Sequence, residues 1–329
     1  MSLPSFQLFR PQTLDEAVSL MGKHPGDVKL VAGGTDLLPS MKQKLFTPQY
    51  VLDLRGVSEL HGIREPPDGS LEIGTLTTLS TIERSPVIRR KFPVLYEAAK
   101  TVASPVLRNM GTVGGNICLD TRCLWYNQSL LWRKSCGFCL KKDGDLCHVA
   151  PGGKFCWAAF SGDTPPALLC LGAELTIAGP RGTRRLPLAE FYVDDGIVRL
   201  HLAPDEIVTR VYLPASSRGW RGSYQKLRVR GSIDYPLAGV AVALKLDPRS
   251  GLVEDARLAV TAVNPAPHVV KDADLILVGT EPGEGLAERV GELAARAAKP
   301  LTTSALTPEY RREMVRVFAK RAVLRAAAN

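Results

Sequence analysis

The first fifty residues change from a helical to a strand-like spacing of apolar side chains. Apolar residues recur at i, i+3, i+4 and i+7 from Leu14 to Met21, behind a capping box formed by Thr13 and Glu16. This pattern predicts a helix that begins at residue 14 and ends before His24. The short apolar runs 28–32 and 50–54 predict two buried strands. Together these elements predict a small α/β unit over residues 1–57.

A second unit with mixed periodicity follows. Residues 71–73 predict a strand, a capping box from Ser80 to Glu83 predicts a helix start, and residues 93–103 predict a further helix. A helix over 165–171, with Asp163 as its N-cap, and a strand over 174–178 complete this unit. Residues 118–160 show neither the helical nor the strand-like spacing of apolar side chains. We therefore predict a second α/β subdomain over 58–180 with an irregular insert at 118–160.

The order of predicted strands and helices changes again in the last third of the chain. Strand-like runs occur at 207–211, 238–246 and 256–263, and two helices follow at 286–298 and 308–327. Pro308 suits the first position of the last helix, directly after the N-cap Thr307. Strands followed by helices indicate a separate α+β domain, which we place at residues 181–329.

Composition narrows the class of protein. The 329 residues are 45% hydrophobic and 23% charged, as in globular proteins. No apolar run approaches the roughly 20 residues of a membrane span, and no secretory signal is recognisable, so a cytoplasmic protein is expected. The net charge is +9, but aromatic residues make up only 6% and no nucleic-acid motif is present. The charge therefore favours a solvated or subunit-docking surface over nucleic-acid binding.

Two glycine-rich loops are candidate binding elements. Residues 33–36, Gly-Gly-Thr-Asp, directly follow a predicted strand, and residues 111–116, Gly-Thr-Val-Gly-Gly-Asn, have the same character. Glycine lets a backbone approach a ligand closely, so that successive N–H groups converge on an anion. Neither loop has the spacing of the dinucleotide fingerprint or of the lysine-containing phosphate loop. One such loop alone would most simply be a tight turn, whereas two matching loops fit a pyrophosphate clamped from both sides.

The insert concentrates cysteine. Five of the seven cysteines lie within 34 residues, and Cys136 precedes Cys139 by a C-x2-C step. Zinc usually takes two such steps, whereas four dispersed thiolates suit an iron–sulfur cubane. We expect five aromatic side chains to cover the cysteine site with apolar surface: Trp125, Trp132, Phe138, Phe155 and Trp157. The pattern favours a metal over inert thiols and an iron–sulfur cluster over zinc, and all three remain open at this point.

Residues 31–42 and 106–116 resemble the two FAD-binding segments of the flavoprotein subunits of molybdenum hydroxylases. That family includes the medium subunit of carbon monoxide dehydrogenase and the flavin domain of xanthine dehydrogenase. Residues 163–168, Tyr224 to Lys226 with Asp234, and residues 310–312 also match the family. The insert is similar to the one that carries a [4Fe–4S] cluster in the β subunits of 4-hydroxybenzoyl-CoA reductases. Its ligand spacing falls on Cys123, Cys139, Cys147 and Cys156 and leaves Cys136 spare.

The resemblance implies a fold and a set of cofactor contacts. The expected α+β fold is a PCMH-type (vanillyl-alcohol oxidase-like) FAD-binding domain of two α/β subdomains, followed by a three-stranded C-terminal sheet with helices. We expect the pyrophosphate to lie on N–H groups of the paired glycines, Asp163 to bind a ribose or another polar group, and Tyr224 and Lys226 to lie near the isoalloxazine. The expected FAD contacts are Ala32, Gly33, Gly34, Thr35, Asp36, Leu37, Thr101, Asn109, Gly111, Thr112, Gly114, Gly115, Asn116, Asp163, Tyr224 and Lys226.

The resemblance also implies a role. It predicts a redox relay with no general acid or base of its own, and places the substrate chemistry on a molybdopterin-binding large subunit. A small subunit with [2Fe–2S] clusters and a ferredoxin-like donor complete the expected system, assembled as a dimer of heterotrimers that dehydroxylates 4-hydroxybenzoyl-CoA. Two alternatives remain: the FAD subunit of an oxidative molybdenum hydroxylase acting on another substrate, and a zinc-stabilised module without redox activity.

Overall fold

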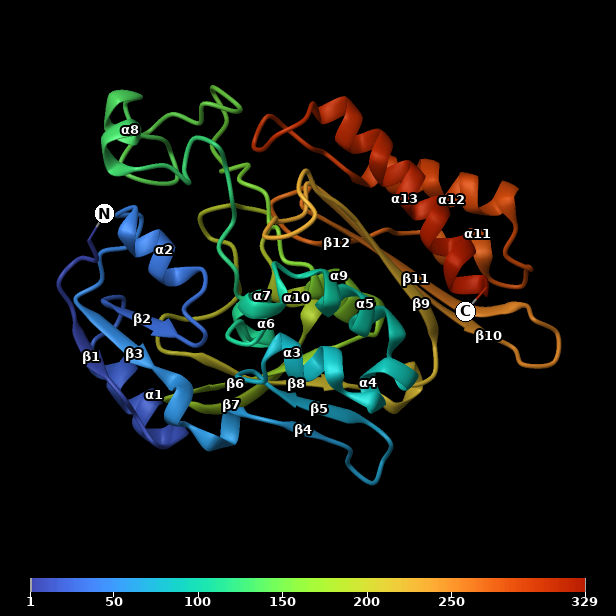
Figure 1. Cartoon of the computed structure of the whole chain (residues 1–329), viewed down its shortest axis with the longest axis horizontal. Coiled ribbons are helices and arrows are strands. Elements are labelled where there is room, and N and C mark those ends of the chain that lie inside the picture. Colours follow the sequence, from blue (N-terminus) through green and yellow to red (C-terminus); the bar gives the residue numbers. More distant parts are fainter. Residues whose placement is uncertain (1, 329) are drawn as a thin grey trace.

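Residues 2–328, which the computed structural model describes, form three β-sheets (Figure 1). The N-terminal sheet is parallel, with the order β1-β3-β2, and its strands are β1 (Gln7–Phe9), β2 (Val28–Val31) and β3 (Tyr50–Asp53). Helices α1 (Leu14–Lys23) and α2 (Leu37–Lys42) lie between these strands in the chain. The side chain of Thr13 caps α1 by accepting the Glu16 N–H at 3.2 Å. The predicted first helix and both predicted strands are therefore confirmed.

The second sheet is antiparallel and extends beyond the boundary expected at residue 180. Its order is β4-β5-β8-β6-β7, with strands β4 (Ile63–Arg64), β5 (Leu71–Gly74), β6 (Glu174–Gly179), β7 (Gly182–Pro187) and β8 (Ile207–Leu213). Strand β8 pairs with both β5 and β6 at the centre of this sheet. The 181–329 segment thus contributes two strands to the second subdomain, and the C-terminal domain begins nearer to residue 221.

Short helices fill the space between the second and third sheets (Figure 1). They are α3 (Leu79–Arg84), α4 (Pro86–Lys91), α5 (Pro93–Thr101), α6 (Pro105–Arg108), α7 (Val113–Ile117), α9 (Thr164–Cys170) and α10 (Leu188–Phe191). Several start at a proline, whose missing N–H costs nothing at a helix start. Helix α9 is buried along its whole length and packs against the third sheet. It therefore carries Asp163, which precedes it, into the interior.

The third sheet has four strands in the order β12-β11-β10-β9, one more than the three expected. They are β9 (Arg221–Leu227), β10 (Ala238–Leu246), β11 (Val253–Thr261) and the two-residue β12 (His268–Val269). Side chains of β10 alternate: Ala241 and Ala243 join the core under α5 and α9, whereas Val240 and Val242 join the core under the C-terminal helices. Those helices are α11 (Ala273–Leu277), α12 (Glu284–Ala297) and α13 (Pro308–Ala328).

The insert projects beside α2 and contains one helix, α8 (Leu130–Ser135), which its sequence did not predict (Figure 1). Ser129 caps this helix by accepting the Trp132 N–H. The buried Arg133 donates a hydrogen bond to the Lys44 carbonyl at 2.9 Å and so joins the insert to the N-terminal unit. Short 3-10 turns occur at Leu54–Gly56, Ser58–Leu60 and Ala215–Ser217. Within residues 2–328, no helix combines the length and apolar character that a membrane crossing requires.

Candidate functional site

The two glycine loops contact each other directly. A Cβ atom added to Gly33 would lie 1.9 Å from the carbonyl oxygen of Met110, and one added to Gly111 would lie 3.6 Å from Oγ1 of Thr35. Gly33 follows β2 in the first sheet, whereas Gly111 follows α6 in the second subdomain. The fold therefore brings the loops into one continuous surface, and only glycine at position 33 permits this approach.

The loops differ in which backbone donors they leave open. Within residues 2–328 the N–H groups of Gly34, Thr35 and Asp36 have no hydrogen-bond acceptor. Gly114, however, donates its N–H to the Thr75 carbonyl at 2.9 Å, and Gly115 donates to Oγ1 of Thr112 at 3.1 Å. The N–H groups of Gly114 and Gly115 are therefore already engaged within the chain, whereas the first loop leaves donors open; contact of either loop with a pyrophosphate stays a prediction.

The second loop serves instead as a packed wall. Thr112 caps α7, which explains why its hydroxyl takes the Gly115 N–H. A Cβ on Gly114 would lie 2.6 Å from Cβ of Thr75, so this glycine allows a close approach to the second sheet. Oδ1 of Asn116 accepts both the N–H and the hydroxyl of Thr164, at 2.9 and 2.7 Å. These contacts fix the loop against α9.

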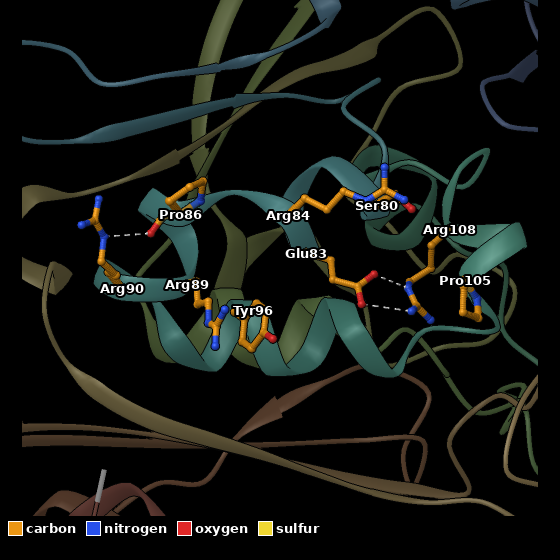
Figure 2. Close-up of a pocket in the computed structure, with 9 residues that line it drawn as sticks. All are labelled: Ser80, Glu83, Arg84, Pro86, Arg89, Arg90, Tyr96, Pro105 and Arg108. Carbon is orange, nitrogen blue, oxygen red and sulfur yellow. Dashed lines mark hydrogen bonds and ion pairs between the residues drawn. The ribbon is translucent and has the colours of Figure 1, made fainter.

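Helix α6, which leads into the second loop, is anchored by a partly buried ion pair (Figure 2). Arg108 is 6% exposed, donates to both carboxylate oxygens of Glu83 at 2.9 and 3.2 Å, and also donates to the Val102 carbonyl. Two charge-assisted bonds from one guanidinium fix orientation as well as position. Next to this pair, Ser80 donates to Oδ1 of Asn109 at 2.6 Å. The start of the second glycine loop is therefore held in place from α3.

The same ion pair lies in the wall of a surface pocket of about 770 Å³ that contains none of the residues predicted to bind FAD (Figure 2). Arg84, Arg89 and Arg90 also line this pocket, and no carboxylate within residues 2–328 forms a salt bridge with them. Arg89 lies over the ring of Tyr96. The wall of this pocket therefore carries three arginines in addition to the paired Arg108.

Four predicted residues from distant segments form one buried polar network. The carboxylate of Asp163 accepts a hydrogen bond from the Tyr224 hydroxyl at 2.8 Å and from Nζ of Lys226 at 2.9 Å. Lys226 also donates to the Thr101 carbonyl at 3.0 Å. Burial, and then the Asp163 charge, raise the pKa of Tyr224 well above its usual value. Asp163 thus already has two strong partners, and its expected contact with a ribose or another polar FAD group stays a prediction.

Tyr224 and Lys226 are not exposed, even though β9 is an edge strand. Helices α5 and α13 pack against β9, and the side chains of both Asp163 and Lys226 are only 3% exposed. An ion pair this deeply buried is costly to break, because the remaining charge would be left without a partner. The network consequently ties the second subdomain rigidly to the C-terminal domain.

Two residues that the sequence did not indicate complete the first loop. Oδ1 of Asp36 accepts hydrogen bonds from Nη1 of Arg122 at 2.9 Å and from the Tyr235 hydroxyl at 2.7 Å. The Arg122 guanidinium lies 4.0 Å from the centre of the Tyr235 ring. Burial, and then Asp36, raise the pKa of Tyr235. Arg122 immediately precedes Cys123, so the insert and the first glycine loop share a direct contact.

The four cysteines that the resemblance selects line one cavity. Cys123, Cys139, Cys147 and Cys156 are buried around a space of about 20 Å³, and they form no disulfide. Cys136 is half-buried and does not line this cavity. Burial raises the pKa of Cys123 and of Cys156 to about 11, and the Lys141 ammonium opposes this rise at Cys156. Four of the five cysteines of the insert therefore line one cavity and Cys136 does not; their role as ligands, which the resemblance implies, stays a prediction.

Only some of the aromatic side chains expected to cover the thiols lie close to the cavity. Trp125, Tyr126 and Val149 line or pack against the cavity, and His148 stacks on Trp125 at 4.4 Å. Trp132 and Phe155, expected as cover, are 37% and 62% exposed. Within residues 2–328, no three His, Cys, Asp or Glu side chains converge on a point where they could hold a single metal ion. The four thiols surround a small gap instead.

Comparison with known proteins covers the whole of this arrangement. Residues 4–216 match the family described as FAD binding domain in molybdopterin dehydrogenase, and residues 222–326 match the CO dehydrogenase flavoprotein C-terminal domain. The chain is 31% identical to the carbon monoxide dehydrogenase medium chain of Afipia carboxidovorans, over 99% of this chain and 98% of that one. It is 29% identical to the nicotine 6-hydroxylase medium subunit of Paenarthrobacter nicotinovorans, over 100% of both.

The same likeness appears in three dimensions. A chain of the Cu,Mo-CO dehydrogenase crystal structure superposes with a TM-score of 0.82 at 29% identity, covering 100% of this chain and 99% of that chain. The expected fold, two FAD-binding subdomains followed by the flavoprotein C-terminal domain, is therefore confirmed. These relatives indicate molybdenum hydroxylases in general and do not single out reduction of 4-hydroxybenzoyl-CoA.

Proposed function

We propose, from the premise that this chain belongs to the FAD-binding subunits of the molybdenum hydroxylase family, that it relays electrons between a molybdenum centre on a partner subunit and an external redox partner. FAD suits this task because it exchanges electrons singly or in pairs. The observation that carries the proposal is the contact between the two glycine loops, next to three backbone N–H groups that have no acceptor within residues 2–328.

The structure supports particular roles for the residues around FAD. Gly34, Thr35 and Asp36 would supply N–H donors to the pyrophosphate, while Gly33 and Gly114 allow the loops to close. Ala32, Leu37, Gly111 and Thr112 flank the same surface. Thr101, Asp163, Tyr224 and Lys226 act as one buried unit that keeps the two domains in register. Side chains held this way exclude water and present fixed dipoles to a flavin.

FAD content tests this assignment directly. The chain is co-expressed with its large and small partner subunits, and the flavin released by denaturation is quantified per chain. One FAD per chain is expected. A complex that forms with full occupancy of the molybdenum subunit but without flavin would overturn the assignment. Replacing Asp36 with alanine should weaken flavin retention, because the Arg122 and Tyr235 contacts that position this loop are lost.

We further propose that Cys123, Cys139, Cys147 and Cys156 hold a [4Fe–4S] cluster. Four buried thiols around one gap provide the donor set that such a cluster takes. The gap of about 20 Å³ is smaller than a cubane, so the lining loops must open outward around it. Apart from α8, the lining segment between residues 124 and 156 has no helix or strand to prevent this movement.

Iron and sulfide analysis of cysteine variants tests the cluster. Cys139→Ser should lose it, whereas Cys136→Ser should keep it, because Cys136 does not line the cavity. Equal iron loss in both variants would contradict the ligand assignment. One zinc per chain with no iron would show that the cysteines form a structural zinc site and hold no iron–sulfur cluster.

The direction of electron flow that the relatives favour is oxidative. Carbon monoxide dehydrogenase and nicotine 6-hydroxylase name oxidations of their own substrates. By analogy we infer a complex with a molybdopterin-binding large subunit and a [2Fe–2S] small subunit, arranged as a dimer of heterotrimers in the cytoplasm. Electrons from the substrate would then reach FAD and leave through the cysteine-lined insert.

A second candidate, reductive removal of the phenolic hydroxyl of 4-hydroxybenzoyl-CoA, is favoured by the insert itself. In that case a ferredoxin-like donor would deliver electrons to the cluster, and basic residues would assist its docking. The holoenzyme is incubated with reduced ferredoxin and 4-hydroxybenzoyl-CoA. Formation of benzoyl-CoA and water, suppressed by high salt, supports this candidate. Reduction of the flavin by an oxidisable substrate, with no benzoyl-CoA formed, supports the oxidative one.

A further inference from the structure

The pocket of about 770 Å³ shown in Figure 2 is lined by four arginines, one glutamate and no lysine. Its lining comes entirely from the four consecutive helices α3 to α6, within residues 80–108. Arginine is favoured over lysine where carboxylates are bound, because its planar guanidinium donates two parallel hydrogen bonds to them. The composition of the lining therefore indicates a surface that binds anions of this shape.

Three of the four arginines have charges that no residue of the chain balances. The Arg84 side chain has no hydrogen bond or ion pair within residues 2–328. Nε of Arg90 donates to the Pro86 carbonyl at 3.3 Å, and the Arg89 guanidinium lies 5.6 Å from the centre of the Tyr96 ring. All three arginines are exposed, and guanidinium groups in proteins are always charged. The pocket thus presents three positive charges to its surroundings.

Two carboxylates that reach these helices are already paired with other cations. Glu83, the acidic residue of the lining, accepts hydrogen bonds from Arg108. Glu65 accepts from Lys91, at the end of α4, and from Arg218, at 2.6 and 3.1 Å. Within residues 2–328, the chain therefore supplies no carboxylate of its own to the three remaining arginines.

Helix dipoles explain only part of this arrangement. Arg84 lies in the last turn of α3, and Arg89 and Arg90 lie in the last turn of α4, where cations interact favourably with the helix dipole. Both helices have only six residues, and the effect at exposed sites is small and screened by salt. A dipole also gives no reason for arginines of two helices to line the same hollow. An anionic partner accounts for their convergence.

The surroundings of the pocket favour a protein over a free anion. Val106 is 75% exposed and follows Pro105, a lining residue, on α6. Interfaces between proteins combine apolar contacts with an enrichment in arginine and aromatic side chains, and Tyr96 provides the aromatic ring here. Transient redox encounters bury little surface. A hollow of this size suits a segment that stays inserted.

We propose that this pocket docks an acidic segment of a subunit that resides in the same complex. The inference rests on the proposed complex with large and small partner subunits. Aspartate or glutamate side chains of that segment pair with Arg84, Arg89 and Arg90, and the paired hydrogen bonds fix orientation as well as affinity. Arg108, in the same wall, holds α6, which leads into the second glycine loop. The docked subunit therefore contacts the helix that precedes the surface proposed to bind FAD.

Dilution of the purified holocomplex, with mass photometry to count intact and dissociated particles, tests the docking. The variant combines Arg84→Glu, Arg89→Glu and Arg90→Glu. The concentration at which half of the complexes have lost this chain should rise at least about tenfold, because attraction across the interface is replaced by repulsion between like charges. The wild-type complex should dissociate more readily as salt is added, and the variant should lose this dependence.

The matched control reverses three exposed arginines of α12 and α13 that form no salt bridge within residues 2–328: Arg289, Arg296 and Arg321. It changes the net charge by the same amount and should assemble as the wild type does. A second pocket variant combines Arg84→Gln, Arg89→Gln and Arg90→Gln. It should show a smaller loss of the same kind, and it decides the question if glutamates at these helix ends prevent folding.

Unchanged assembly in the pocket variants would overturn the proposal, and so would an equal loss in the control. Normal assembly combined with slower reduction by ferredoxin would assign the pocket to a diffusing donor, which also overturns docking of a resident subunit. A wild-type complex that assembles without flavin would instead refute the proposed function. The two failures are therefore distinguishable.

Discussion

Replacing Gly33 with alanine would place a methyl carbon 1.9 Å from the carbonyl oxygen of Met110 and 2.5 Å from its carbonyl carbon. Cβ atoms are essentially never found within 3.0 Å of such atoms, so the two glycine loops must separate by more than about 1 Å. Both contacts are with backbone, which cannot turn away as a flexible side chain can. Inserting a methyl group into packed surroundings costs about 1–3 kcal/mol.

That cost falls on the surface proposed to bind FAD. If the open N–H groups of Gly34, Thr35 and Asp36 act on the cofactor only while the loops are in contact, FAD affinity should fall roughly ten- to a hundredfold. The matched control is Gly111→Ala, whose Cβ would lie 3.3 Å from the Leu107 carbonyl and 3.4 Å from Cδ1 of Leu79. A shift of a few tenths of an ångström relieves those contacts, so a much smaller loss is expected.

The assay is titration of the deflavinated complex with FAD, followed by the change in flavin fluorescence. Urea unfolding of the same samples without FAD separates a general loss of stability from a local one. Gly33→Ala should lose affinity by a larger factor than Gly111→Ala. Equal affinity for FAD in Gly33→Ala and in the wild type would show that contact between the loops is not needed for binding.

Three further substitutions, with one control, test the supporting structure. Asp163→Asn leaves Lys226 buried without an anionic partner, and urea unfolding should show a loss of about 3 kcal/mol; a loss below about 1 kcal/mol would contradict the buried pair. Arg108→Met removes both bonds to Glu83 and should cost about 2 kcal/mol and weaken FAD binding, whereas Arg84→Met, at an unpaired position in the same pocket wall, should change neither. Hydrogen bonds from Arg55 lower the pKa of Asp53 in the folded state, so this carboxylate stabilises the fold above about pH 4 and its contribution disappears as the pH falls through the lowered value. Thermal unfolding between about pH 5 and pH 2 should therefore depend less on pH in Asp53→Asn than in the wild type, and identical profiles would count against this pair.

Local signals in the sequence identified the elements whose causes are local. The capping box at Thr13 defines α1, and the long alternating run at 238–246 defines β10. Strand β9 was missed because Arg221 to Leu227 lacks a regular alternation; its burial comes from α5 and α13, which lie elsewhere in the chain. Helix α8 was missed because six residues are too few to show a period.

In the candidate site, too, features with local causes could be predicted from the sequence and features that depend on tertiary contacts could not. Glycine and cysteine could be selected from the sequence because their chemistry is unusual and their spacing is informative. The hydrogen-bond partners of these residues could not be predicted from the sequence, because they arise from tertiary contacts. Nothing near Asp36 in the sequence indicates Arg122 or Tyr235, and nothing near Cys139 indicates that Lys141 would reach Gly196. The hydrogen bonds of Gly114 and Gly115 likewise depend on Thr75, which directly follows β5, and on the cap of α7.

The central claim is that one chain holds both FAD and a four-cysteine iron–sulfur cluster. The most direct measurement is the visible spectrum, with iron, sulfide, zinc and flavin analysis, of anaerobically purified wild-type and Cys147→Ser complexes. Flavin bands over a broad iron–sulfur shoulder are expected in the wild type. Cys147→Ser should contain about four fewer irons per chain and the same amount of FAD. Equal iron in both complexes, or zinc in place of iron, would contradict the account.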